Sequence, residues 1–168
     1  MTDRDILQQK VEGDYNSESG FSDLRGVAKH VLRRKQIILY NWIAIEATNA
    51  NTAEVFCWKA NVACRIEKLE ILANSNVTAN NADYKTLTVA KRSAAGGAAT
   101  TIVAINTAAT AAGGTGNWTS FVGLDITGSN TTLNSLAAGE GITLTSAYTS
   151  AGVAIPINTR LVATILEL

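Results

Sequence analysis

The sequence is poor in the residues from which most catalytic and metal sites are built. Among its 168 residues it has one histidine, His30, and two cysteines, Cys57 and Cys64. The cysteine spacing matches neither a zinc ribbon nor a redox CxxC motif, and one histidine cannot complete a zinc site. A Ser-His-Asp triad would require His30 to reach from the N-terminal segment into the rest of the chain. We therefore expect no enzyme, no cofactor, no metal and no small-molecule substrate.

Charge is also scarce, because only 17% of the residues are charged and the net charge is zero. The usual charged share is about a quarter. A neutral chain has no electrostatic preference for nucleic acid or for an anionic membrane, so neither is expected as a partner. The low charge favours a surface that is hidden in an assembly, and a monomer with a neutral polar surface is the alternative.

No long apolar run is present either. Nothing approaches the roughly 18 apolar residues of a membrane span. The N-terminal MTDRDILQQK is charged and lacks the apolar stretch of a signal peptide. What the chain does have is a hydrophobic fraction of 46%, which is enough for a packed core.

The charged residues are concentrated near the N-terminus. Residues 1–40 hold seven Lys/Arg and six Asp/Glu, out of 14 of each in the whole chain. This predicts an N-terminal arm over residues 1–35 and a packed domain over residues 36–168.

The arm contains the pattern of a short amphipathic helix. Ser22 is suited to the N-cap, and basic residues fall in the last turn, where they favour the helix dipole. The apolar stripe at helical spacing consists of Leu24, Val27, Ala28, Val31 and Leu32. The basic residues are Arg25, Lys29, Arg33, Arg34 and Lys35. They indicate either an anchor for an acidic protein surface or for nucleic acid, or a solvated helix end balanced by Asp14, Glu18 and Asp23.

After the arm the pattern changes to that of β-strands separated by short turns, without helical periodicity. This predicts a mainly β protein, an antiparallel β-sandwich or barrel of about eight strands. The expected strands are Ile37–Glu46, Glu54–Lys59, Val62–Ala73, Tyr84–Arg92, Thr100–Thr107, Trp118–Ile126, Ile142–Tyr148 and Arg160–Leu168.

The third expected strand changes its inward parity. Val62, Cys64 and Ile66 alternate as one inward face, whereas Leu69 and the apolar residues after it alternate on the opposite parity. A β-bulge near Glu67 would keep both sets in one core, since a bulge inserts one extra residue into a strand. We therefore predict a bulge at Glu67–Lys68.

Three segments from this point onward resemble small β proteins of tailed bacteriophages. They are ACRIEKLEILANSNVTA (Ala63–Ala79), NADYKTLTVAKR (Asn81–Arg92) and LAAGEGITLT (Leu136–Thr145), with Glu140 where the family usually has Asp. The resemblance implies a jelly-roll-like domain. It also implies a virion protein, either a head decoration or cement protein, often trimeric, or a head or tail fibre component. It implies no catalytic residues.

On that basis we expect a capsid decoration protein that is made in the host cytoplasm and bound to the capsid exterior. Its partner would be the major capsid protein, and it would be a homotrimer. The expected capsid-contact residues of the arm are Leu24, Arg25, Val27, Lys29, Val31, Leu32, Arg33, Arg34 and Lys35. The expected subunit-interface residues are Ile37, Leu39, Trp42, Ile43 and Ile45.

Two other functions compete with this interpretation. A fibre tip that binds a receptor or carbohydrate would need exposed aromatic residues, for which Trp58, Trp118 and Tyr148 are candidates, although buried tryptophans are more common. A cupin-like enzyme on a jelly roll is the second rival, and the lack of a histidine cluster argues against it.

Overall fold

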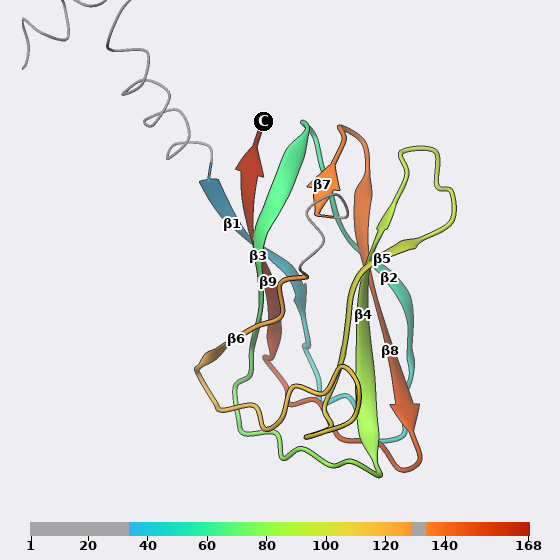
Figure 1. The fold of residues 1–168 in the computed structure, drawn as a ribbon, viewed down its shortest axis with the longest axis vertical. Helices are drawn as coiled ribbons and strands as arrows, with labels where there is room; N and C mark the ends of the chain where they lie inside the picture. Colours follow the sequence, from blue (N-terminus) through green and yellow to red (C-terminus); the bar gives the residue numbers. More distant parts are fainter. Residues whose placement is uncertain (1–33, 129–133) are drawn as a thin grey trace, which may run out of the picture. The chain divides into compact units, whose positions relative to one another are not determined.

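The computed structural model describes residues 34–128 and 134–168 (Figure 1). Within this part, Lys35–Leu168 form one compact unit. The predicted helix and His30 lie outside the described residues, except for Arg34 and Lys35 at the end of that helix. No helix in the described part of the chain could cross a membrane.

Nine β-strands are present in the described ranges, and they form two antiparallel sheets packed as a sandwich. The predicted fold class is therefore confirmed. The strands are β1 (Arg34–Asn41), β2 (Thr52–Lys59), β3 (Cys64–Leu72), β4 (Tyr84–Arg92), β5 (Thr100–Asn106), β6 (Gly123–Asp125), β7 (Ser135–Leu136), β8 (Gly141–Thr149) and β9 (Arg160–Glu167).

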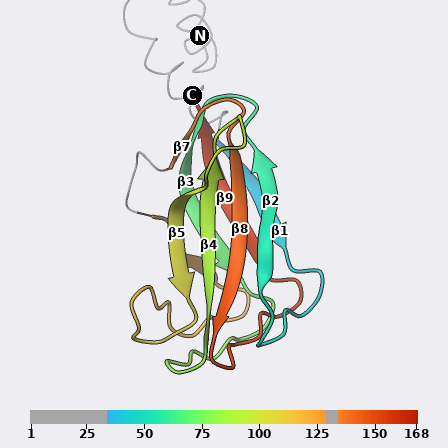
Figure 2. The ribbon, with the colours of Figure 1, turned by 90° about the vertical axis from the view of Figure 1, so that its right-hand side faces the viewer.

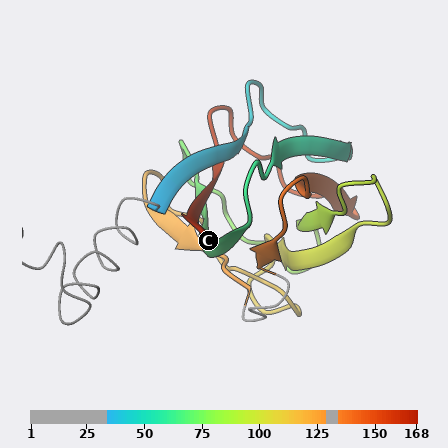
Figure 3. The same ribbon diagram turned by 90° about the horizontal axis from the view of Figure 1, so that it is seen from above.

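The order of the strands is that of a jelly roll. One sheet runs β1-β9-β3-β6, with β7 also paired to β3, and the other runs β2-β8-β4-β5. Figure 2 shows the second sheet in front of the first, and Figure 3 shows the two layers from above. The late strands β8 and β9 each lie between two earlier strands, an interleaving typical of jelly rolls.

The core lies between the two sheets and consists of alternate residues of the strands. Leu87 and Val89 of β4 are buried in it, together with Leu144 of β8 and Ile165 of β9. Large aliphatic side chains buried in this way each stabilise the fold by about 1.5–3 kcal/mol.

The predicted bulge in β3 is confirmed. Ile66 lies opposite Ile165 of β9, but Lys68 lies opposite Thr164, so Glu67 is the additional residue. The insertion restores the inward direction of the apolar residues that follow. The apolar residues of β3 that are buried on the two sides of the bulge are Cys64, Ile66, Leu69 and Ile71.

The start and the end of β1 differ from the prediction. Arg34 and Lys35 lie in β1, so the predicted last helical turn is wrong at these two residues. Lys35 forms an ion pair with Glu167 of β9, the neighbouring strand, which favours the extended conformation there. The strand ends at Asn41 and not at Glu46.

The predicted strand Trp118–Ile126 is also wrong in extent. Only Gly123–Asp125 is a strand, and Trp118 makes an isolated bridge with Val77. Phe121 has a φ of 61°, which an extended strand cannot contain. The alternating sequence pattern is therefore interrupted by a turn.

Candidate functional site

The five predicted interface residues do not share one environment. Leu39 and Trp42 are buried in the core of their own chain, and Ile37 is half-buried against that core. Ile43 and Ile45 are 83% and 64% exposed. Only these last two therefore offer free apolar surface.

Ile157 is a further exposed isoleucine, on the segment that runs beside residues 43–45. The backbone of Trp42 exchanges hydrogen bonds with the segment at residues 158–159, and Glu46 exchanges two with Ile155. The segments 43–45 and 156–158 therefore run side by side between these hydrogen bonds. Ile157 is 40% exposed. We call Ile43, Ile45 and Ile157 the isoleucine cluster.

The described basic residues of the predicted arm are Arg34 and Lys35, and both are exposed in β1. The other predicted capsid-contact residues lie outside the described residues: Leu24, Arg25, Val27, Lys29, Val31, Leu32 and Arg33.

A buried polar network, which was not predicted from the sequence, lies beside the isoleucine cluster. The Glu46 carboxylate accepts hydrogen bonds from Trp42 Nε1 at 2.6 Å, from Lys85 Nζ at 2.9 Å and from Ser146 Oγ. Lys85 Nζ also donates to the carbonyl oxygen of Ala47 at 2.7 Å. The available signal was the parity of Lys85, which lies on the inward face of β4 with Leu87.

The charge of this network is stabilised by its partners. Burial alone would raise the pKa of Glu46, but the hydrogen bonds from Ser146, Trp42 and Lys85 and the charge of Lys85 outweigh it. The pKa is therefore lowered, and the carboxylate is ionised. Because every charged atom in it has partners within the fold, we assign the network to stability and not to ligand binding.

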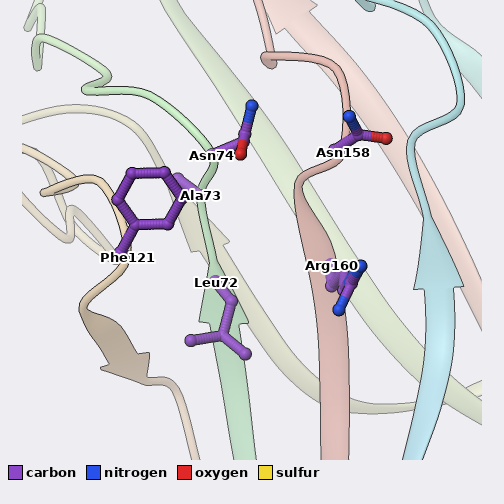
Figure 4. A pocket seen from close by; sticks show the side chains of 6 residues that line it. All are labelled: Leu72, Ala73, Asn74, Phe121, Asn158 and Arg160. Carbon is purple, nitrogen blue, oxygen red and sulfur yellow. The ribbon is translucent and has the colours of Figure 1, made fainter.

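A second candidate site is a cleft at the ends of β3 and β9. It has a volume of about 400 Å³. The residues that line it are Leu72, Ala73, Asn74, Phe121, Asn158 and Arg160 (Figure 4). We call it the Phe121 cleft.

Phe121 is the most unusual residue of the cleft. Its side chain is 78% exposed, and its φ of 61° is rare for a residue with a bulky side chain. The backbone amide of Phe121 donates a 2.9 Å hydrogen bond to the carbonyl oxygen of Ala73, which holds the turn against the end of β3. The fold thus keeps an aromatic ring in solvent at a cost in backbone strain.

Asn158 and Arg160 lie across the cleft from Phe121 (Figure 4). Arg160 is the first residue of β9 and pairs in register with Leu72 of β3. Asn158 also has a positive φ, 61°, and its backbone N–H donates a 2.6 Å hydrogen bond to the carbonyl oxygen of Trp42. Both residues are thus positioned by backbone pairing.

The aromatic residues proposed for the rival fibre function are placed differently. Trp118 is buried, and its Nε1 donates to Thr115 Oγ1 at 2.8 Å. Trp58 is half-buried against the core, whereas Tyr148 is partly exposed. Phe121 was not predicted as a candidate, because its exposure depends on the turn that interrupts the predicted strand.

Both cysteines are free thiols. Cys64 is buried and Cys57 is half-buried. Among the described residues, no group of three or more His, Cys, Asp or Glu is arranged to hold a metal ion.

Comparison with known proteins adds no family to this description. No protein-family model matches the chain, and no curated protein matches it significantly.

Proposed function

We propose that the chain is a structural virion protein that decorates the head of a tailed bacteriophage. In this proposal it is a homotrimer on the capsid exterior, bound to the major capsid protein. The observation that carries the proposal is the isoleucine cluster at one end of a jelly-roll domain. The sequence resemblance described above supports it.

The isoleucine cluster suits a contact between subunits. Three exposed isoleucines lie on two adjacent segments, and exposed apolar residues gathered in one region often mark sites of association. Leu39 and Trp42 are occupied by the core, so the proposed interface consists of Ile43, Ile45 and Ile157.

The arm would supply the contact with the capsid. Its basic and apolar residues, from Leu24 to Arg33, would bind coat subunits, and a trimer would combine three such arms through avidity. A protein that binds only the assembled shell stabilises it by mass action.

The test compares the full-length chain with a chain that begins at Arg34, the first residue of β1. We expect the full-length chain to co-sediment with phage capsids and the shortened chain to remain in the supernatant. Equal sedimentation of the two chains would contradict the role of the arm. No sedimentation of either chain would contradict the decoration function.

Light scattering tests the trimer through the double substitution Ile43→Ser and Ile45→Ser. We expect this variant to remain folded, because the side chains of Ile43 and Ile45 are exposed and do not support the core. We expect it to be a monomer, because the substitutions remove the proposed interface. Val122→Ser is the matched control, since Val122 is also exposed but precedes β6. A monomeric wild type at high concentration would contradict the proposed interface.

A fibre or receptor-binding module is the second candidate function. The Phe121 cleft favours it, because an exposed aromatic ring beside amide side chains is suited to a small polar ligand. Binding to host cells and not to capsids would support this alternative.

A further inference from the structure

Three polar side chains of the Phe121 cleft have no partner among the described residues. Within the described part of the chain, Arg160 forms no ion pair, and the side-chain amides of Asn74 and Asn158 make no hydrogen bond. By contrast, Arg65 and Lys68 of β3 and Arg92 of β4 are each paired with a glutamate. The cleft thus gathers hydrogen-bonding capacity that the fold itself does not use.

The apolar side of the cleft is made by Phe121 and Leu72. The phenyl ring lies at one side of the hollow, Leu72 and Asn74 lie between, and Asn158 and Arg160 lie opposite (Figure 4). A ligand in the cleft would therefore meet an apolar surface on one side and amide and guanidinium groups on the other.

This combination fits the two kinds of surface of a sugar ring. One face of a pyranose presents C–H groups, which can pack on an aromatic ring, and the hydroxyl groups at its edge can hydrogen-bond to amides. Of the described residues that line the cleft, Arg160 is the charged one. A guanidinium prefers a carboxylate, to which it can donate two parallel hydrogen bonds.

We propose that the Phe121 cleft binds a sugar that carries a carboxylate. Phe121 is the platform for the ring, Asn74 and Asn158 hydrogen-bond to its hydroxyls, and Arg160 binds the carboxylate. The backbone strain at Phe121 supports this assignment, because strained residues persist where a function maintains them. The binding does not depend on the proposed capsid contact, which involves other residues.

The test is a titration of the full-length chain followed by two-dimensional NMR, with D-glucuronate as the probe. D-glucose and inorganic phosphate are the comparison ligands. We expect glucuronate to shift the amide signals of the cleft, to bind more tightly than glucose, and to be displaced poorly by phosphate. If phosphate shifted the same amide signals as strongly as glucuronate, the cleft would bind anions without recognising a sugar, and the proposal would be overturned.

Two substitutions separate the roles of the ring and the charge. Phe121→Gly removes the ring and suits the positive φ, so the fold should be retained and glucuronate affinity should fall about tenfold. Arg160→Gln should abolish the preference for glucuronate over glucose. Phe56→Ala is the control, because Phe56 is an exposed phenylalanine on β2 of the other sheet.

Each result of the glucuronate titration either supports or contradicts the proposed sugar site. A shift by glucuronate that is lost in Phe121→Gly and retained in Phe56→Ala supports the proposal. No shift by glucuronate in the wild type, or the same affinity in Phe121→Gly, contradicts it. Capsid co-sedimentation is measured separately, so failure of the decoration function and failure of sugar binding are distinguishable.

Discussion

The Nζ atom of Lys85 lies 2.9 Å from Oε1 of Glu46 in the interior of the sandwich. The lysine side chain is fully buried, and the glutamate side chain is only 7% exposed. Lys85 belongs to β4 of one sheet, whereas Glu46 follows β1 of the other sheet. This ion pair therefore connects the two layers of the fold.

Removal of the lysine charge tests this connection. We expect Lys85→Met to lower the free energy of unfolding by about 3–5 kcal/mol, because the carboxylate of Glu46 would remain buried without its counter-ion. Urea denaturation followed by circular dichroism measures the loss.

The control for this experiment is Lys35→Met. Lys35 is exposed and pairs with Glu167, so its removal should cost less than about 1 kcal/mol. A double variant, Lys85→Met with Glu46→Gln, should recover part of the lost stability because it leaves no unpaired charge. If the Lys85→Met variant had the same free energy of unfolding as Lys35→Met, the proposed contribution of the buried ion pair would be contradicted.

Stability should fall in acid because two paired carboxylates must then be protonated. Against the effect of burial, hydrogen bonds from Ser146, Trp42 and Lys85 hold the pKa of Glu46 below its ordinary value of 4.5. Hydrogen bonds from Arg92 lower the pKa of Glu54 from 4.5 to about 2. A lowered folded-state pKa contributes stability that is present above the unfolded pKa and lost as the pH falls through the folded value.

We therefore expect the urea midpoint to decrease between pH 4.5 and about 2. Glu46→Gln and Glu54→Gln should each give a flatter dependence on pH over this range. A wild-type midpoint that does not change on acidification, or variants whose curves run parallel to it, would contradict the assignment.

The two thiols should be unreactive in the folded protein. Burial raises the pKa of Cys57 to about 11, and burial together with Glu167 and Glu140 raises that of Cys64. Because the thiolate is the reactive form, we expect slow modification by a chromogenic disulfide reagent at neutral pH. Both thiols should react in urea, and rapid reaction of either thiol without urea would show that it is exposed.

Gly152 should be intolerant of a side chain. Its φ is +69°, and an added Cβ would lie 2.0 Å from the carbonyl oxygen of Thr48. Gly96 is the matched control, since its φ is +75° and no atom of the described residues lies within 4 Å of the added Cβ.

We expect Gly96→Ala to cost about 1–2 kcal/mol, from the left-handed backbone alone. Gly152→Ala should cost more, because the backbone around Thr48 must also move. Thermal denaturation of the two variants measures the difference, and equal melting temperatures would show that the contact with Thr48 is absent.

Much of the fold was predictable because alternation along a strand is a local property. The parity change between Ile66 and Leu69 required an extra residue, and the structure places it at Glu67. The same reasoning failed at Trp118–Ile126, where Val122, Leu124 and Ile126 alternate but the backbone turns at Phe121. The residue type does not predict a positive φ at Phe121, because most bulky residues adopt a negative φ.

The sequence by itself determined the β class, most strand positions and the bulge in β3, since each depends on the side chains of consecutive residues. Only the tertiary structure decided which strands are neighbours, and therefore which distant residues meet. Glu46 and Lys85 are 39 positions apart, and the Phe121 cleft combines residues of three separate segments. Such contacts follow from the jelly-roll order of the strands, which no local pattern specifies.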